Sequence, residues 1–124
     1  MRFCKSIESF WICVVDSEDI CIERFAILKD PENSITCIST RQISEKCSGP
    51  YKALIFEETP IDIVGFLLKV LKVLAENDIP IMAYSTYQRD IILVPANKVE
   101  KAVQALKNAG FIEVSDRLIL HKSG

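Results

Sequence analysis

Residues 79–94 of this 124-residue chain have the sequence IPIMAYSTYQRDIILV. Two apolar runs flank a polar knuckle at residues 85–90, which carries two hydroxyl residues, an aromatic residue and a carboxylate. Short apolar runs bounded by turn residues are typical of β-strands, so the segment predicts a β-hairpin. A helix-like segment lies on each side of it, which makes the hairpin the middle of a β-α-β-β-α-β unit.

The helices beside the hairpin are indicated by residues suited to helix ends. Thr59 and Asp62 are alternative N-caps of the first helix. Asn97, followed three residues later by Glu100, predicts a capping box for the second helix, and Gly110 suits the left-handed position after its end. The elements predicted for this half are a strand at 51–56, a helix at 60–77, strands at 79–85 and 90–94, a helix at 98–109, and terminal strands at 111–114 and 118–120.

The first half of the chain predicts a smaller version of the same unit, without the long helix. Its turn sequence, DPEN at residues 30–33, combines a fixed proline φ with side chains that bond back to their own backbone. The elements predicted for this half are a buried strand at 10–15, a short strand or one helical turn at 20–23, hairpin strands at 25–28 and 35–38, and one or two helical turns at 40–46 capped by Thr40.

The pair Gly49-Pro50 is the strongest boundary signal in the chain. We therefore expect a reduced unit over residues 1–50 and a complete unit over residues 51–124. Because about fifty residues cannot bury a core alone, the two units must pack against each other or against another chain. The predicted fold class is α+β, with tandem ferredoxin-like (βαββαβ) units, antiparallel sheets and helices on one face.

Composition excludes several partner classes. Acids and bases are interspersed, the net charge is −2, and 49% of the residues are apolar. A nucleic-acid partner usually requires a basic face, and a bilayer span requires roughly 18–20 consecutive apolar residues. Acidic residues also interrupt any signal-peptide core near the N-terminus. We therefore expect a soluble, cytoplasmic chain with neither a nucleic-acid nor a membrane partner.

The five cysteines show no C-x-x-C spacing, and their number is odd. Cys13, Cys21 and Cys37 lie within apolar strand-like runs, where a free thiol behaves as a small hydrophobic side chain. We therefore expect these three to be free and buried, with Cys4 and Cys47 as candidates for exposed thiols.

The first predicted helix is apolar around most of its circumference. Such a helix must be covered on more than one side, either by the first half of the chain or by another subunit. This pattern predicts a homodimer. Its polar positions form a single narrow stripe that consists of Asp62, Gly65, Lys69, Lys72 and Glu76.

Nothing in the sequence favours catalysis. The single histidine, His121, lies near the C-terminus in a strand-like run, and no Ser-His-Asp set, P-loop or dinucleotide glycine fingerprint is present. We expect no enzyme activity, no catalytic or metal-binding residues and no cofactor.

From residue 59 onward the chain resembles ACT-domain proteins, in particular the short tandem-ACT group that includes the CASTOR-like amino-acid sensors. The stretches that carry the resemblance are GFLL at 65–68, LAENDIPI at 74–81 and above all YSTYQRDIILV at 84–94, where the family pattern is roughly S-T-aromatic-x-x-D-x-x-L-V. Residues 25–36, FAILKDPENSIT, match the family's strand-turn-strand more loosely. The family's Thr-Gly at the first helix is Val64-Gly65 here, so one hydroxyl is missing.

The resemblance implies a ligand-responsive regulatory module that binds a small molecule, namely a free amino acid, where two ACT units meet. A helix N-terminus and a nearby glycine suit an α-carboxylate, and a carboxylate with hydroxyl groups suits an ammonium group. With no output domain, the module would act on a separate enzyme or signalling protein. The implied ligand-binding residues are Ser34, Ile35, Val64, Gly65, Ser85, Thr86, Tyr87 and Asp90.

Two alternatives stay open at this point. The first is that these residues are structural. Residues of the knuckle are common turn formers, Asp90 would then only cap the hairpin, and Gly65 would only permit close helix packing. The second functional hypothesis is therefore a ligand-free ACT-like module that dimerises or docks to a partner protein.

Overall fold

The computed structural model describes residues 1–57, 64–86 and 89–120, and the statements below concern these residues. One sheet carries all the strands, with two α-helices and two short 3₁₀ helices beside it. In chain order the elements are β1 (Arg2–Lys5), β2 (Phe10–Val15), η1 (Glu18–Ile20), β3 (Arg24–Lys29), β4 (Ile35–Ser39), β5 (Cys47–Phe56), α1 (Val64–Glu76), β6 (Met82–Ser85), β7 (Asp90–Pro95), η2 (Ala96–Lys98), α2 (Val99–Asn108) and β8 (Ile112–Glu113).

The long strand β5 organises the sheet. Along one edge it pairs with β2 near its start and with β1 near its end, and β7 pairs with it between Tyr51 and Ile55. The sheet order is β3-β4-β2-β5-β1-β8, while β6 joins through β7. All of these pairings are antiparallel except β1 with β8. The predicted α+β class, dominated by antiparallel pairing, is confirmed.

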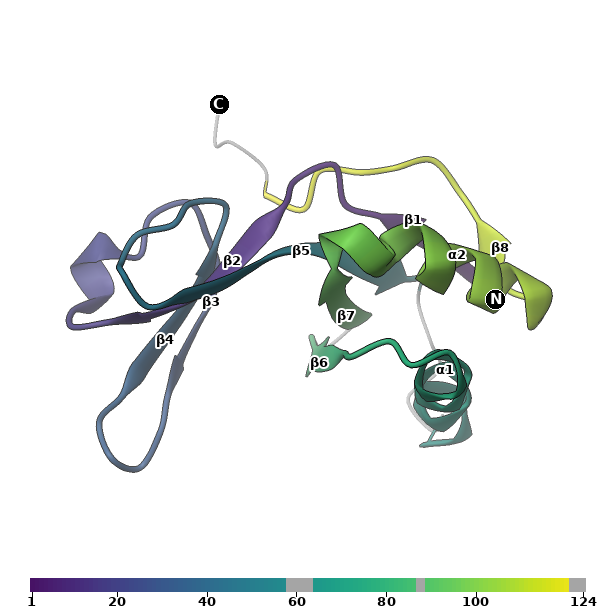
Figure 1. The fold of residues 1–124 in the computed structure, drawn as a ribbon, viewed down its shortest axis with the longest axis horizontal. Helices are drawn as coiled ribbons and strands as arrows, with labels where there is room; N and C mark the ends of the chain where they lie inside the picture. The colour runs from purple at the N-terminus through teal and green to yellow at the C-terminus, as the bar shows by residue number, and fades with distance from the viewer. Residues whose placement is uncertain (58–63, 87–88, 121–124) are drawn as a thin grey trace.

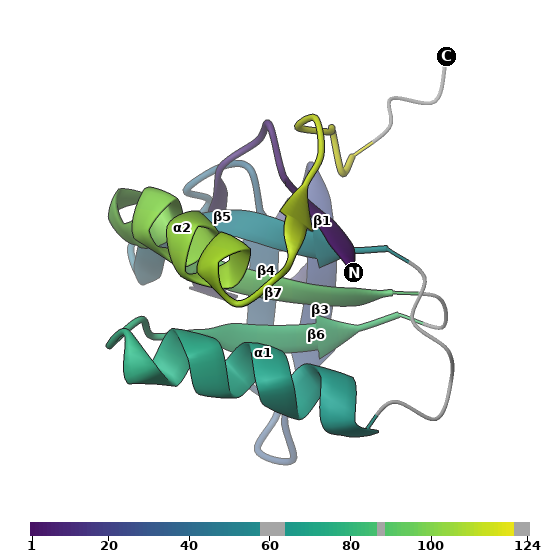
Figure 2. The ribbon, with the colours of Figure 1, turned by 90° about the vertical axis from the view of Figure 1, so that its right-hand side faces the viewer.

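Both α-helices cover one face of the part of the sheet formed by β5, β6 and β7 (Figure 2). Beneath them lies the main core, in which Phe56 contacts Phe3, Phe66 and Phe111 with ring centroids 5.5–6.0 Å apart. Phe66, Val70 and Leu74 supply the buried side of α1. Burial of several aromatic rings of this size is a large hydrophobic contribution to stability.

A second apolar cluster lies where the two parts of the sheet meet. Phe10 contacts Phe25, and Phe25 meets Tyr84 edge to face at 5.9 Å. Strands β2, β3 and β4 extend away from the helices, as Figure 1 shows. The two parts of the chain therefore share both a sheet and an apolar contact.

The predicted boundary at residue 50 lies inside β5. Gly49 has φ +141°, and an added Cβ would lie 3.0 Å from the carbonyl oxygen of Phe10. The register between β2 and β5 shifts at this point, between Phe10 and Ile12. Glycine in a strand often marks such an irregularity or a close backbone approach. The division into units at 1–50 and 51–124 stays a prediction.

Two predictions about helices are wrong. Residues 40–46 form bends and irregular backbone rather than a helix. The Ser39 hydroxyl donates to the Arg41 carbonyl and accepts from the Arg41 N–H, which holds a local turn instead. In α2 the N-cap is Lys98, which makes no side-chain capping bond, since Asn97 is part of η2. Gly110, with φ +99°, does take the predicted left-handed position after α2.

Other boundaries differ in smaller ways. Segment 20–23 forms neither of its predicted elements, and the helical turn is η1 at Glu18–Ile20. The C-terminal strand is short, and residues 118–120 form no strand, although Arg117 makes an isolated bridge to Ser6. The predicted helix start at 60, with Thr59 and Asp62 as caps, lies outside the described residues.

The prediction of free cysteines is wrong for four of the five residues. Disulfides join Cys13 to Cys47 and Cys21 to Cys37, whereas Cys4 is free and buried. This pairing could not be predicted from the sequence, because the partners are 34 and 16 residues apart. Cys13 and Cys47 meet through the pairing of β2 with β5, and Cys21 and Cys37 meet within one apolar cluster. Both disulfides belong to a small apolar cluster in the first part of the chain.

Candidate functional site

The predicted hairpin site is built at the end of β6 and the start of β7. Ser85 and Asp90 face each other in register, and the Ser85 Oγ donates a hydrogen bond to Asp90 Oδ1 at 2.7 Å. The Thr86 N–H donates to the Arg89 carbonyl at 2.8 Å, and Thr86 Oγ1 accepts from the Arg89 N–H at 3.1 Å. The hairpin therefore holds a carboxylate and two hydroxyl groups side by side. Tyr87 lies outside the described residues.

The start of α1 lies at the same edge of the sheet as this hairpin. A short connection joins the end of α1 to β6, which runs back antiparallel to the helix, so Ser85 returns toward the helix start (Figure 2). A helix N-terminus leaves backbone N–H groups without intrahelical partners and carries a partial positive charge. The structure thus places the described start of α1 and the Asp90 carboxylate at the same edge of the sheet.

Gly65 stands in the first turn of α1 and is exposed. An added Cβ there would meet no heavy atom of the described residues within 4 Å. The alternative that this glycine permits close helix packing therefore has no support among the described contacts. Val64 is the first residue of the described part of α1.

Ser34 and Ile35 lie elsewhere in the single chain. Ser34 belongs to the β3–β4 turn, where its N–H donates to Asp30 Oδ1 at 3.1 Å, and Ile35 is the first residue of β4, opposite Lys29. Figure 1 shows this turn well separated from α1. One copy of the chain therefore does not bring these two residues to the hairpin.

Sequence reasoning missed Arg89, which lies in the knuckle itself. Its Nε is buried and has no hydrogen-bond partner among the described residues. Its charge reaches the buried Cys4 thiol: burial raises the pKa of Cys4, while Arg117 and, more weakly, Arg89 act to lower it. A buried guanidinium nitrogen without a partner is costly and suits an acceptor supplied by a ligand.

A half-open pocket of about 790 Å³ lies on another side of the molecule, between the first part of the chain and the C-terminal segment. The Glu8 carboxylate fixes one wall by accepting the backbone N–H groups of Ile119 and Leu120 at 2.7–3.0 Å. The pocket is lined by Glu8, Ser9, Glu23, Arg24, Thr40, Leu118 and Leu120.

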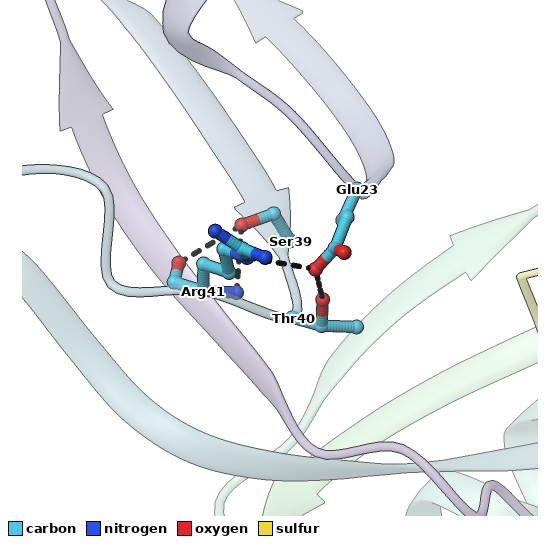
Figure 3. Close-up of polar contacts among 4 residues, drawn as sticks. All are labelled: Glu23, Ser39, Thr40 and Arg41. Carbon is cyan, nitrogen blue, oxygen red and sulfur yellow. Dashed lines mark hydrogen bonds and ion pairs between the residues drawn. The ribbon is translucent and has the colours of Figure 1, made fainter.

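Glu23, which also lines this pocket, makes the polar contacts that Figure 3 shows. Its Oε2 accepts from the Thr40 hydroxyl at 2.7 Å and from Arg41 Nε at 3.0 Å. Its own φ is +48°, which is uncommon for a residue other than glycine. Periodicity and motif spacing carry no signal for this network, because it joins the segment before β3 to the end of β4.

The described part of the chain has neither a metal-binding cluster nor a membrane-spanning helix. Among those residues no group of three or more histidine, cysteine, aspartate or glutamate side chains is placed to hold a metal ion. None of the described helices is long and apolar enough to cross a membrane.

Comparison with known proteins supports the resemblance in the second part of the chain. Residues 49–108 match the family model of the ACT domain. This segment is just under half of the 124 residues. The matched segment begins in β5 and ends with α2, so it contains α1, the β6–β7 hairpin and the knuckle. None of the curated protein sequences matches the chain significantly.

Solved structures share the fold at low sequence identity. Protein Atu0741 from Agobacterium tumefaciens has a TM-score of 0.79 at 18% identity, covering 98% of this chain and 97% of that one. VC0802 from Vibrio cholerae is described as a protein of unknown function and possible transport protein. It has a TM-score of 0.72 at 19% identity, covering 86% of this chain and 88% of that one. The regulatory subunit of aspartate kinase from Thermus flavus has a TM-score of 0.63 at 12% identity, covering 86% of this chain and 95% of that one. These likenesses establish a shared architecture.

Proposed function

We propose that this chain is a regulatory module that binds a free amino acid at an interface between ACT-like units. The observation that carries the proposal is the Ser85–Asp90 pair, held at the sheet edge where α1 begins. The ACT family match over residues 49–108 supports it, as does the likeness to a structure described as the regulatory subunit of an aspartate kinase.

Each group of the ligand would have a partner at this edge. The free N–H groups at the start of α1 and the Arg89 guanidinium would take the α-carboxylate, and Gly65 would leave room for its approach. Asp90 would accept from the ammonium group through the oxygen that Ser85 does not use. Charge-assisted hydrogen bonds contribute about 1.5–3 kcal/mol each, so two or three of them supply about 3–9 kcal/mol before ordering costs. Micromolar affinity corresponds to about 8 kcal/mol, so apolar contacts in the closed pocket would have to supply the rest.

A second copy would complete the site. Ser34 and Ile35 lie far from the hairpin within one chain, so they would have to come from a partner protomer to close the pocket. The outer surface of α1 also leaves Leu68 65% exposed. A homodimer would cover this side chain and would transmit binding as a change in protomer arrangement, with coupling of typically 1–3 kcal/mol. The target would be a separate enzyme or signalling protein.

The location and the absence of catalysis remain part of the proposal. The chain would act in the cytoplasm without a cofactor and without enzyme activity of its own. Disulfides are typical of oxidising compartments, so the state of the four paired cysteines bears directly on the location. Thiol labelling in intact cells before lysis tests this location, because reduced cysteines would support the cytoplasm and the two disulfides of the structure would contradict it.

Calorimetry of the purified chain against each of the twenty amino acids tests the proposal. We expect saturable heat with one or a few of them, and loss of that heat in Asp90→Asn. Glu76→Gln removes a carboxylate at the far end of α1 that makes no ion pair or side-chain hydrogen bond with the described residues, and this variant should bind like the wild type. Silence across the panel from a stable dimer would instead favour the ligand-free docking module, which the replacement of the family's threonine by Val64 already favours.

A further inference from the structure

Three cysteines stand in one row across three neighbouring strands. In the sheet, Cys13 of β2 is directly opposite Cys47 of β5 on one side and opposite Cys37 of β4 on the other. Residues directly opposite each other in antiparallel strands project to the same face of the sheet. The row continues to a fourth cysteine, because Cys37 is bonded to Cys21.

The spacing of Cys13 and Cys37 permits a third disulfide. The Cα atoms of Cys13 and Cys47 are 4.1 Å apart, as in a non-hydrogen-bonded pair, and the Val14 N–H points to the β5 side through its bond to the Lys46 carbonyl. The N–H and C=O of Cys13 therefore face β4, which makes Cys13 and Cys37 a hydrogen-bonded pair about 5.5 Å apart. That Cα separation lies within the roughly 4.4–6.8 Å that is usual for disulfides.

Access to the row is limited to one end. Cys13, Cys21 and Cys37 are at most 3% exposed, whereas Cys47 is partly exposed at the start of β5. The Ser44 Oγ lies 3.7 Å from the Cys47 Sγ, in the segment of bends that precedes the strand. Cys47 is therefore the most exposed member of the row, and an external thiolate reaches it first.

We infer that Cys47 is a site of modification by low-molecular-weight thiols, and that the modification is relayed through the row to Cys21. The external thiolate attacks the Cys47 Sγ and forms a mixed disulfide, and the Cys13–Cys47 bond breaks to release the Cys13 thiolate. Cys13 then attacks the Cys37 Sγ and forms the Cys13–Cys37 bond, and the Cys21–Cys37 bond breaks to release the Cys21 thiolate, which takes up the proton of the incoming thiol. The number of disulfide bonds stays at two, with one of them now to the modifier, so no net oxidant or reductant is needed.

The relay has a structural consequence at the other end of the row. The Cys21–Cys37 bond ties the segment after η1 to β4, two residues before Glu23 and three before Arg24, which line the pocket. Release of Cys21 removes this tie while the new Cys13–Cys37 bond keeps β2 and β4 joined. Modification at Cys47 thereby loosens one wall of the pocket and leaves the sheet intact.

Peptide mapping after treatment of the oxidised full chain with reduced glutathione tests the relay. The reaction is stopped with acid, free thiols are alkylated, and disulfide-linked peptides are identified by mass spectrometry. We expect one glutathionyl group on Cys47, alkylated Cys21 in equal amount and a Cys13–Cys37 cross-link, with Cys4 unmodified. Alkylated Cys13 beside an intact Cys21–Cys37 bond, an adduct on another cysteine, or no reaction would each overturn the inference.

A variant tests the central exchange without any added thiol. In Cys21→Ser the Cys37 thiol stands opposite the Cys13–Cys47 bond, so we expect a Cys13–Cys37 cross-link and an alkylated Cys47 in the purified protein. The double variant Cys21→Ser/Cys47→Ser retains only the Cys13 and Cys37 pair of the row, and mild oxidation should join them. Circular dichroism confirms the fold of each variant. A folded variant whose Cys13 and Cys37 remain unjoined after oxidation would contradict the geometry.

Discussion

Replacement of Gly65 by alanine should strengthen the fold and weaken ligand binding. Gly65 lies in the first turn of α1, and an added Cβ meets no described heavy atom within 4 Å. Alanine is about 0.8–1.0 kcal/mol more favourable than glycine within a helix, and less at the first turn, so Gly65→Ala should raise the free energy of unfolding by up to about 1 kcal/mol. In a domain of this size that is a rise of about 2–4 °C in Tm.

The same methyl group would obstruct a carboxylate that approaches the start of the helix. Loss of one charge-assisted hydrogen bond of about 1.5–3 kcal/mol lowers affinity by about 10- to 150-fold. Thermal unfolding without ligand and calorimetry with the best-binding amino acid measure the two effects separately. Ala75→Gly, at an exposed position near the other end of α1, is the matched control and should lower Tm with unchanged affinity. A lower Tm in Gly65→Ala would assign the glycine to packing, and an unchanged affinity would place the ligand elsewhere.

Three further predictions concern stability. Reduction of the disulfides, which close loops of 16 and 34 residues, should lower the free energy of unfolding by about 3–4 kcal/mol each in the chain-entropy account, measured by urea titration with and without reductant. Phe56→Ala, at a fully buried ring with three aromatic neighbours, should lower the free energy of unfolding by about 3–5 kcal/mol. Leu68→Ala, at a 65% exposed position, should change the free energy of unfolding of the monomer by less than about 0.5 kcal/mol. Equal costs would contradict the assigned core. Burial raises the pKa of the Cys4 thiol above its ordinary 9.0, so the unfolded chain loses this proton first and the free energy of unfolding should fall as pH rises past about 9. In urea titrations across about pH 8–10.5, Cys4→Ala should make this fall less steep. An unchanged slope would exclude the thiol as its cause.

The elements that could be predicted from the sequence are those set by local pattern. The β6–β7 hairpin, the β3–β4 hairpin and the strand at Phe10–Val15 follow from apolar runs bounded by turn residues, and all three occur in the structure. The ending of α2 at Gly110 likewise follows from the conformational freedom of one residue.

The failures arise where a contact distant in sequence outweighs the local pattern. Gly49 was predicted to mark the boundary between two units. In the structure it lies within β5 and allows this strand to pass close to the Phe10 carbonyl and continue. Cys13, Cys21 and Cys37 were predicted to be buried free thiols. Their disulfide partners depend on how distant segments pair, which no local pattern specifies. The pocket lined by Glu23 and Glu8 joins four separate parts of the chain, so neither motif nor spacing could indicate it.

The candidate site divides in the same way. Ser85, Thr86 and Asp90 are neighbours along the hairpin, so the sequence places them together and the structure shows their hydrogen bonds. Arg89 was overlooked because a charged residue in a turn usually faces solvent, whereas its Nε is buried here. Whether Ser34 and Ile35 share the site depends on a second copy of the chain.

Hydrogen–deuterium exchange with and without the best-binding amino acid measures the proposed interface most directly. The account predicts slower exchange in three separate segments: the hairpin around residues 84–91, the first turn of α1, and the β3–β4 turn at residues 33–36. Protection confined to other segments, or an exchange pattern that no amino acid alters, would contradict binding between ACT-like units.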